Sequence, residues 1–450
     1  MAASGTRIVV LDDDPTGIQT VHGCLLLTDW KPAAVRAALT DQQPFFYVLT
    51  NTRACGRGKA QSIVGEVVAN VLKVNEALGY SLLFVSRSDS TLRNHFPAEV
   101  EVIVRNLEAR DARPVDAIFL VPAFIECGRV TVGNTHYLVE GGRRIPVSET
   151  EFARDSVFGF HTAVLPDYIA ERTRGAVRAA EVRSIPLDLL RNTAVSGESP
   201  AAAAQRETLD GFLHDLNYGV YVVVNAETYA DLSCFARAVL RQTAAGKRFV
   251  FQSAASLVKA LAGVPDQPLL GREIVSRTGP GLFVVGSYVE RTTAQIRRLL
   301  KSDEVEGVEI VVEEILKSGE ALWRPLLERM GKIRRQGRAP VVFTSRSELK
   351  FGSADERLRA GETVSHFLAR LVRGLPEAPA YLVGKGGITS HDILVRGLNV
   401  SQARVLGQIL PGVPVIMTPD DSPFPRMPYV IFPGNVGDED ALWRVFQVLK

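Results

Sequence analysis

Short apolar runs bounded by turn residues recur along the chain, and amphipathic stretches lie between several of them. In the first half these runs cover residues 8–11, 45–50, 81–85, 117–121, 220–224 and 248–252. Residues 59–78 and 98–109 carry apolar positions at helical spacing. Strands that alternate with helices are typical of a mostly parallel sheet covered by helices.

The same pattern repeats in the second half after an interruption. It slackens from Ala254, and a new strand run begins at Gly281. Further runs cover residues 308–312, 340–344, 380–384, 413–417 and 429–432. A chain of 450 residues is longer than one hydrophobic core usually grows. We therefore predict two α/β domains, residues 1–270 and 271–450, with mostly parallel sheets flanked by helices and an active site in the cleft between the domains.

The composition is that of an ordinary globular protein, with 46% hydrophobic and 23% charged residues. The net charge is +2 and no Lys/Arg run dominates, which argues against nucleic acid or an anionic membrane as the main partner. The four cysteines form no Cys-x-x-Cys pair, and no segment has the roughly 18 successive apolar residues of a membrane helix. The N-terminus also lacks a signal-peptide pattern. We therefore expect a cytoplasmic protein with unpaired thiols.

Three adjacent carboxylates, Asp12, Asp13 and Asp14, follow the first apolar run and precede a Pro-Thr-Gly turn that includes Thr16. Ligands of open α/β sheets bind beyond the carboxyl ends of the strands. Acids at that place can hold a metal, orient a hydroxyl or accept its proton. A single Asp could instead cap the turn. Three acids in a row favour a site.

Arginines follow two further strand runs of the first half. Arg53, in Asn51-Thr52-Arg53, suits bidentate capture of a carboxylate or phosphate, although a solvated loop arginine is the alternative. Residues 86–95 hold two arginines, an aspartate and a histidine, which is more than helix capping requires.

Polar groups also follow the fourth run, at residues 121–131, which contain Phe124 and Arg129. Core packing is the alternative role for Phe124. Four strand ends that each deliver polar groups would form a pocket for a small, hydroxyl-rich anion.

Glycine-containing turns follow three strand runs of the second half. They are Gly286-Ser287, Gly386-Gly387-Ile388-Thr389 and Gly434-Asn435. Glycine lets backbone N–H groups approach a phosphate closely. Neither the Gly-x-x-x-x-Gly-Lys-Ser/Thr nor the Gly-x-Gly-x-x-Gly pattern is met, and any one of these turns could be purely structural. Three such turns with few acids favour a nucleotide.

Taken in order, these blocks resemble the four-carbon acid sugar kinase family over essentially the whole chain. The resemblance rests on residues 13–17, 51–53, 89–93, 122–124, 128–129, 286–287, 386–390 and 434–435. It implies an N-terminal sugar-acid-binding domain, a C-terminal nucleotide-binding domain, and ATP-dependent phosphorylation of the terminal hydroxyl of a threonate, erythronate or oxo-tetronate.

Two positions depart from the family pattern. Asn94 stands where the family often has Gly, which would change the backbone angles of that loop. Ile388 stands where many members carry an acid. Since Ile388 removes a carboxylate, the coordination of Mg²⁺ stays open.

The strand-end chemistry and the resemblance together predict roles for individual residues. Asp13, Asp14 or Asp89 would accept the hydroxyl proton, and arginines would hold the substrate carboxylate or the moving phosphoryl group. The predicted catalytic residues are Asp13, Asp14, Asp89 and Arg93. The predicted sugar-acid-binding residues are Thr16, Asn51, Thr52, Arg53, Arg87, Ser90, Thr91, Phe124 and Arg129. The predicted ATP-binding residues are Ser287, Gly386, Gly387, Ile388, Thr389, Gly434 and Asn435. ATP and Mg²⁺ are the expected cofactors.

Two other classes of protein fit part of the pattern. A non-catalytic sensor of sugar acids and nucleotides is kept open by Ile388. An NAD(P)-dependent sugar-acid dehydrogenase is a second alternative, since doubly wound domains host both chemistries. The missing Gly-x-Gly-x-x-Gly pattern and the three acids at the first strand end count against the dehydrogenase. Exposed apolar stripes would also allow a homodimer.

Overall fold

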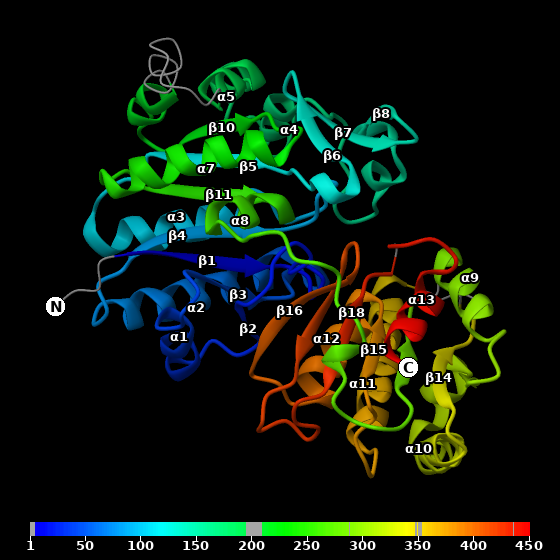
Figure 1. Cartoon of the computed structure of the whole chain (residues 1–450). Helices are drawn as coiled ribbons and strands as arrows, with labels where there is room; N and C mark the ends of the chain where they lie inside the picture. Colours follow the sequence, from blue (N-terminus) through cyan, green and yellow to red (C-terminus); the bar gives the residue numbers. More distant parts are fainter. Residues whose placement is uncertain (1–4, 195–208, 288, 347–348, 350–352, 435) are drawn as a thin grey trace. The chain divides into compact units, whose positions relative to one another are not determined.

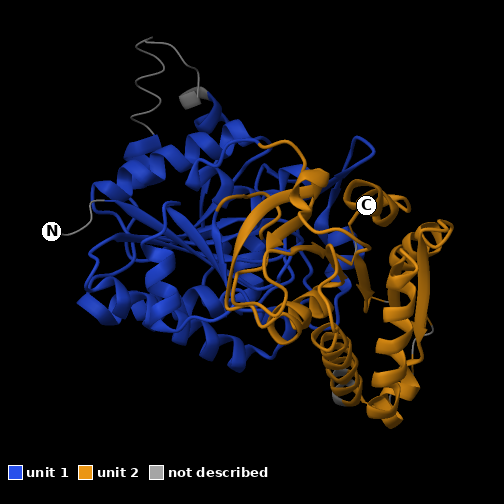
Figure 2. Ribbon diagram, turned by 60° about the horizontal axis from the view of Figure 1, so that its bottom comes forward, with its two compact units in different colours: residues 1–17, 24–266 blue, residues 18–23, 267–450 orange. Residues whose placement is uncertain are grey.

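The computed structural model is an α/β protein that divides into two compact units (Figures 1 and 2). It describes residues 5–194, 209–287, 289–346, 349, 353–434 and 436–450. Unit 1 comprises residues 1–17 and 24–266, and unit 2 comprises residues 18–23 and 267–450. The predicted α/β class, with mostly parallel strands flanked by helices, is confirmed.

Unit 1 is built on a parallel sheet with the strand order β2-β3-β1-β4-β11-β5-β10-β9 (Figure 1). The strands are β1 (Thr6–Asp12), β2 (Leu25–Leu27), β3 (Phe45–Leu49), β4 (Ser81–Arg87), β5 (Ala117–Val121), β9 (Arg183–Ile185), β10 (Val220–Val224) and β11 (Phe249–Ser253). Most of their residues are buried, as expected for a parallel sheet that is covered on both faces.

Helices cover both faces of this sheet. On β5, Ile118 and Leu120 pack in a core with α1 (Pro32–Leu39), α2 (Arg57–Asn75) and α3 (Ala98–Asp111). Phe119 points the other way, and its ring centroid lies 5.1 Å from that of Phe235 on α7 (Tyr229–Ala244). Alternate residues of one strand thus serve two cores. Further helices of the unit are α4 (Leu165–Arg172), α5 (Leu187–Ala194) and α8 (Ala255–Ala262), and residues 209–214 are also helical. Short 3-10 turns lie at Thr52–Ala54, Ile125–Cys127, Val147–Glu149, Glu151–Arg154 and Ala179–Glu181.

A small antiparallel sheet follows β5 in unit 1. Its strands are β6 (Arg129–Val132), β7 (Thr135–Glu140) and β8 (Arg143–Pro146). The backbone N–H of Asn134 donates to Oδ1 of Asn225 at 2.7 Å, and Thr131 bridges to Ala226. Because Asn225 directly follows β10, the insertion is fixed to the carboxyl ends of the parallel strands. The apolar runs of the sequence did not predict it.

Unit 2 has a sheet with the order β13-β14-β12-β15-β18-β17-β16. The strands are β12 (Leu282–Val285), β13 (Val305–Ile310), β14 (Ala339–Thr344), β15 (Leu382–Lys385), β16 (Gln402–Leu410), β17 (Val413–Met417) and β18 (Pro428–Phe432). The first five in the order are parallel, and β17 runs antiparallel to β18 and β16. The strand predicted over 308–312 ends at Ile310, because Val311 already caps the next helix.

In unit 2, different helices follow the neighbouring strands β12 and β15. β12 leads into α9 (Glu290–Leu299), which shares a core with α13 (Ala441–Leu449) on one face. β15 leads into α12 (Gly387–Asp392), which packs with α11 (Ala354–Arg373) and the π-helical turn Ile393–Gly397, and α11 in turn packs with α10 (Val312–Arg335). A 3-10 turn lies at Arg272–Ile274. β12 and β15 are neighbours, and their carboxyl ends lie at the edge where open α/β sheets generally bind ligands.

In the described part of the chain, no helix is long and apolar enough to cross a membrane.

Gly17 gives the first testable prediction. A methyl group at Gly17 would lie 1.9 Å from a carboxylate oxygen of the buried Asp12. The variant Gly17→Ala should therefore lose about 1–3 kcal/mol of unfolding free energy, as overpacked sites do. Chemical denaturation measures this loss. Gly58→Ala, in α2, adds a methyl group with nothing within 4 Å of it. The unfolding free energy of this variant should instead increase by about 0.5–1 kcal/mol. Equal effects of both variants would contradict the packing described here.

Candidate functional site

The strand register of unit 1 places Asp12 beside Arg87. The two residues are partners on the parallel strands β1 and β4, and Nη1 of Arg87 lies 3.1 Å from Oδ1 of Asp12. Both side chains are buried. Burial raises the pKa of Asp12 to about 7, and the charge of Arg87 opposes this rise. The pair lies at the carboxyl ends of these two neighbouring strands.

Arg53 joins three aspartates from two strand ends. Its Nη2 lies 3.2 Å from Oδ1 of Asp13 and 2.8 Å from Oδ2 of Asp14. Its Nη1 lies 3.6 Å from Oδ1 of Asp89. Arg53 follows β3, whereas the aspartates follow β1 and β4. One guanidinium group therefore ties together the ends of three strands.

Arg93 extends the cluster on the side of Asp89. Its Nε lies 3.0 Å from Oδ2 of Asp89, and its Nη1 lies 3.8 Å from Oδ2 of Asp155. The guanidinium also lies over the ring of Phe152, 4.7 Å from the centroid. The side chains of Arg53 and Arg93 are 21% and 23% exposed. Both arginines can therefore reach a bound anion while they hold the aspartates.

The acids of this cluster differ in their affinity for a proton. Burial raises the pKa of Asp13 well above its usual value. Burial opposes ionisation of Asp14 and Asp89 as well. The charge of Arg53 and the hydrogen bonds from Thr16 outweigh the effect of burial at Asp14, and its pKa is lowered. The charges of Arg93 and Arg53 do the same at Asp89, whose pKa is also lowered. Asp13 is thus the strongest base among the three candidates for proton transfer.

Two short turns orient the acids that have lowered pKa values. The backbone N–H of Thr16 donates to Oδ1 of Asp14 at 2.8 Å, and that of Thr91 donates to Oδ2 of Asp89 at 3.2 Å. In each turn the threonine hydroxyl bonds to the same carboxylate. An aspartate that accepts from the backbone two residues on is a common turn device.

The loop after β3 contributes backbone as well as side chains. Asn51 adopts a left-handed conformation (φ 50°), and its N–H donates to the carbonyl of Asp12 at 3.3 Å. Thr52 is buried below it, with its hydroxyl 3.3 Å from that of Thr50.

Phe124 and Arg129 take no part in the ion pairs of the cluster among the described residues. Phe124 is buried and exchanges backbone hydrogen bonds with Arg129 at 3.0 and 2.9 Å. The guanidinium of Arg129 donates to the carbonyl of Cys127. Among the described residues, no ion pair joins Arg129 to Asp13, Asp14 or Asp89.

Glu99 is a buried acid at this site that the sequence did not reveal. It lies on α3, accepts a hydrogen bond from the hydroxyl of Ser86 at 3.1 Å, and has its pKa raised by burial. Nearby, Nε2 of His95 lies 3.1 Å from the carbonyl of Thr52 and 2.9 Å from that of Cys55. Since carbonyls only accept, this nitrogen carries the hydrogen.

Three side chains from the segment after β5 hold the loop that follows β4. Nε2 of His136 donates to the carbonyl of Ser90 at 2.8 Å, and the hydroxyl of Tyr168 donates to that of Leu92 at 3.0 Å. Nη2 of Arg172 donates to the carbonyl of Asn94 at 3.0 Å. Burial lowers the pKa of His136 to about 4, so its ring is neutral.

The backbone at Asn94, where the family often has Gly, does not require a glycine. In this loop it is Leu92, not Asn94, that adopts a left-handed backbone (φ 67°). The side chain of Asn94 is buried and accepts the N–H of Phe96 at 2.8 Å.

The predicted turns of unit 2 pack against one another without room for larger residues. A methyl group on Gly286 would lie 2.0 Å from Oγ1 of Thr389. One on Gly386, whose φ is 104°, would lie 3.1 Å from Cβ of Ser287, and one on Gly434 would lie 3.3 Å from its Oγ. The turns after β12, β15 and β18 therefore meet at Ser287.

Side chains of α9 and of the segment after β14 hold these turns. The hydroxyl of Thr292 donates to the carbonyl of Gly434 and lies 3.1 Å from that of Ser287. Nε2 of Gln295 donates to the carbonyl of Val436 at 3.1 Å. Nη1 of Arg346, which the sequence did not single out, donates to the carbonyl of Ser287 at 2.6 Å.

Asn435 and Ile388 are the other predicted residues of these turns. Asn435 lies outside the described residues. Ile388 is in α12, and its side chain is 54% exposed. Gly387 begins this helix, which has only six residues. We therefore base the nucleotide site on the packed glycine turns and not on a helix terminus.

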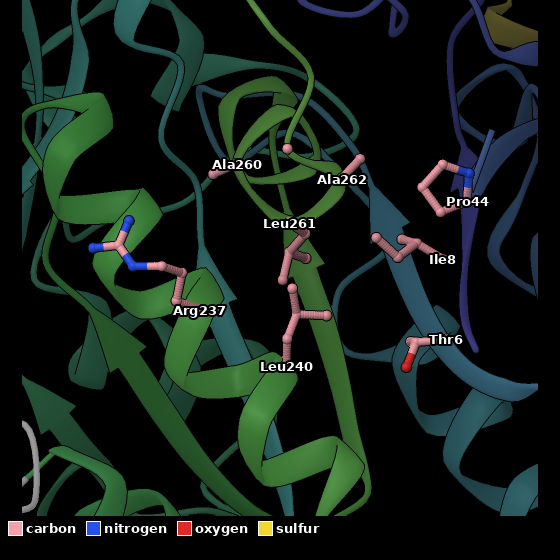
Figure 3. A pocket seen from close by; sticks show the side chains of 9 residues that line it. Thr6, Ile8, Pro44, Arg237, Leu240, Ala260, Leu261 and Ala262 are labelled. Atoms are coloured by element: carbon pink, nitrogen blue, oxygen red, sulfur yellow. The ribbon is translucent and has the colours of Figure 1, made fainter. Parts of the chain in front are cut away.

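A cavity of about 390 Å³ lies at the other end of the unit 1 sheet (Figure 3). It is lined by Thr6 and Ile8 at the start of β1, by Pro44, and by residues of α7 and α8 that include Arg237. Apart from Arg237 its lining has no charged group. The cavity thus lacks the acids that the carboxyl end of the sheet provides.

Comparison with known proteins agrees with the division into two parts. Residues 8–261 match the model of a sugar-binding N-terminal domain, and residues 282–442 match that of a nucleotide-binding C-terminal domain. A D-erythronate kinase from Heliobacterium modesticaldum is 26% identical over 299 residues, which cover 65% of this chain and 60% of that kinase. A D-threonate kinase from Cupriavidus necator is 26% identical over 382 residues, which cover 82% of this chain and 81% of that kinase.

Solved structures share the fold. One from Salmonella typhimurium LT2, described as a putative tRNA synthase, has a TM-score of 0.68 at 18% identity and covers 98% of both chains. A Haemophilus influenzae protein has a TM-score of 0.64 at 15% identity and covers 98% of this chain and 100% of its own. At these identities the likeness shows the fold alone.

The matched domains define a protein that combines a sugar-binding half with a nucleotide-binding half. The chain belongs to the four-carbon acid sugar kinase family.

Arg53 gives a second prediction. Arg53→Met leaves three aspartates without their shared cation and should cost about 3 kcal/mol of unfolding free energy at pH 7. The lowered pKa values of Asp14 and Asp89 stabilise the fold above the usual carboxylate pKa, and this contribution is lost as the pH falls. The deficit of the variant should therefore shrink below about pH 4.

Denaturation curves at several pH values measure this effect. Arg105→Met, at an exposed position of α3, is the control and should change the unfolding free energy by less than about 0.5 kcal/mol. A deficit of Arg53→Met that does not vary with pH would contradict the electrostatic account.

Proposed function

We propose that this protein is an ATP-dependent kinase that phosphorylates the terminal hydroxyl of a four-carbon sugar acid. The observation that carries the proposal is the cluster in which Arg53 pairs with Asp13, Asp14 and Asp89. The cluster contains arginines that can bind the carboxylate of a sugar acid. It also contains a carboxylate that can accept the proton of a hydroxyl. The similarity to proteins named erythronate and threonate kinases supports this substrate class.

The arginines provide the means to orient the sugar acid. Arg53 and Arg93 both remain partly exposed, and guanidinium groups bind carboxylates through paired hydrogen bonds. With its carboxylate held in this way, a four-carbon acid directs its other end away from the arginines. Hydroxyl and amide groups of the same strand ends, such as those of Asn51 and Ser90, are available to its hydroxyls.

Asp13 is the proposed general base. It removes the proton from the terminal hydroxyl as that oxygen attacks the γ-phosphorus of ATP. The new oxygen–phosphorus bond forms while the bond to the β-phosphate oxygen breaks, and ADP leaves. The raised pKa of Asp13 favours proton uptake, whereas Asp14 and Asp89, with lowered values, remain ionised and keep the arginines in place.

The packed glycine turns of unit 2 are the proposed nucleotide site. Gly286, Gly386 and Gly434 bring backbone close to Ser287 and Thr389, as close approach to a phosphate chain requires. The nucleotide would arrive as MgATP. Within the described residues no group of three His, Cys, Asp or Glu side chains could hold a metal. This agrees with Mg²⁺ bound chiefly through phosphate oxygens and water.

The direct test is ADP release by the purified chain with MgATP against a panel of threonates, erythronates and oxo-tetronates. We expect turnover with at least one member and none in the control without sugar acid. ATP binding without turnover on any member would contradict the kinase proposal and favour a sensor.

Asp13 gives a third prediction. Asp13→Asn should lower kcat by about 10²–10⁴-fold, the usual contribution of a general base. In the wild type, activity should rise with pH as Asp13 loses its proton, over a range above that of ordinary carboxylates, because its pKa is raised.

Steady-state kinetics across pH will show whether this rise of activity with pH disappears in Asp13→Asn. Asp167→Asn, an exposed acid of α4 in the same unit, should retain wild-type rates. If Asp13→Asn keeps both the wild-type rate and the rise of activity with pH, Asp13 is not the base.

A further inference from the structure

Lys385 is a fully buried lysine at the end of β15. Its Nζ donates to the carbonyl of Pro433 at 2.9 Å and lies 4.0 Å from the centroid of the Phe432 ring. Among the described residues no carboxylate pairs with it. A buried ammonium normally has an acidic partner, because an uncompensated charge in the protein interior is costly.

The charged groups that act on Lys385 are themselves cations. Arg291 lies at the start of α9, and Arg346 follows β14. The other elements in contact with the lysine present the Phe432 ring and a backbone carbonyl. Burial first, and then these two arginines, lower the pKa of Lys385 to about 7. The surroundings are therefore built for an anion that the polypeptide itself does not supply.

The position of Lys385 identifies the kind of anion. Lys385 precedes Gly386, and its hydrogen-bond acceptor Pro433 precedes Gly434. Both glycines pack against Ser287. The ammonium thus lies at the base of the turns that we assign to the phosphates of the nucleotide.

Given the nucleotide site proposed above, we propose that Lys385 is the charge partner of the nucleotide's phosphate groups and that nucleotide binding is coupled to uptake of a proton at this lysine. The free protein holds Lys385 partly neutral near pH 7. The phosphates make the ammonium form favourable, so the proton is taken from solvent as the nucleotide binds. A purely structural lysine that only holds the carbonyl of Pro433 would show no such coupling.

Calorimetric titration of the full-length protein with MgADP tests this coupling. At pH 8 about nine tenths of a group with a pKa near 7 is neutral, while the phosphates are already ionised. Titrations in buffers of different ionisation enthalpy should reveal uptake of close to one proton per nucleotide. The affinity should fall roughly tenfold per pH unit above pH 7.

Lys385→Met, which keeps the length of the side chain, should abolish the proton uptake and weaken MgADP binding by about tenfold to a hundredfold. Lys301→Met, at an exposed position after α9, is the control and should behave as the wild type. Should Lys385→Met fail to fold, the proton count and the pH dependence of the wild type decide alone.

The outcomes separate this inference from the proposed function. A wild type that does not bind MgADP contradicts the nucleotide site itself. A wild type that binds without proton uptake, or a folded Lys385→Met that binds equally well, overturns the role of Lys385 and leaves the kinase proposal intact.

Discussion

The ion pairs of Arg53 are the interaction on which the sugar-binding half depends. Asp13 and Asp14 follow β1, Asp89 follows β4, and Arg53 follows β3, so one guanidinium offsets charges from the ends of three strands. Acids buried this closely would repel one another without it. The same arrangement sets their proton affinities apart, because the arginines keep Asp14 and Asp89 ionised while burial dominates at Asp13.

In both halves, side chains donate hydrogen bonds to backbone carbonyls of the functional turns. In unit 1, His136, Tyr168 and Arg172 donate to the carbonyls of alternate residues in the loop after β4. In unit 2, Thr292 and Arg346 do the same for the turns after β18 and β12. The turns of unit 2 are also tied by backbone hydrogen bonds, since the N–H groups of Gly286 and Gly386 donate to the carbonyls of Lys385 and Phe432 at 3.3 and 2.9 Å. The halves differ in what the turns carry: acids and arginines in one, glycines and the buried Lys385 in the other.

The sequence predicted most of the parallel strands, because buried parallel strands are short apolar runs that end in turn residues. The polar groups after β1, β3 and β4 were also expected, and the structure joins them by ion pairs, although their roles stay predictions. The antiparallel insertion, β16 and the parallel strands β2 and β9 were not predicted. β16 alternates buried and partly exposed residues and so forms no continuous apolar run. β2 and β9 have only three residues each.

Glu99 carried no local signal, and the sequence could not show what His136 contacts. Glu99 lies on an amphipathic helix where an acid is usually solvated, and only the packing of α3 beside Ser86 buries it. The partner of His136 is 46 positions away in the chain. Lys385 did carry a signal, because a lysine that ends an apolar strand just before two glycines is unusual.

The most direct test of the central claim is the structure of the product formed from MgATP and a turned-over tetronate, read by phosphorus and proton NMR. If Arg53 and Arg93 hold the carboxylate and Asp13 deprotonates the far hydroxyl, the phosphorus signal will couple to the two protons of the terminal carbon. An acyl phosphate, or a phosphate on the hydroxyl next to the carboxylate, would contradict this placement of the substrate.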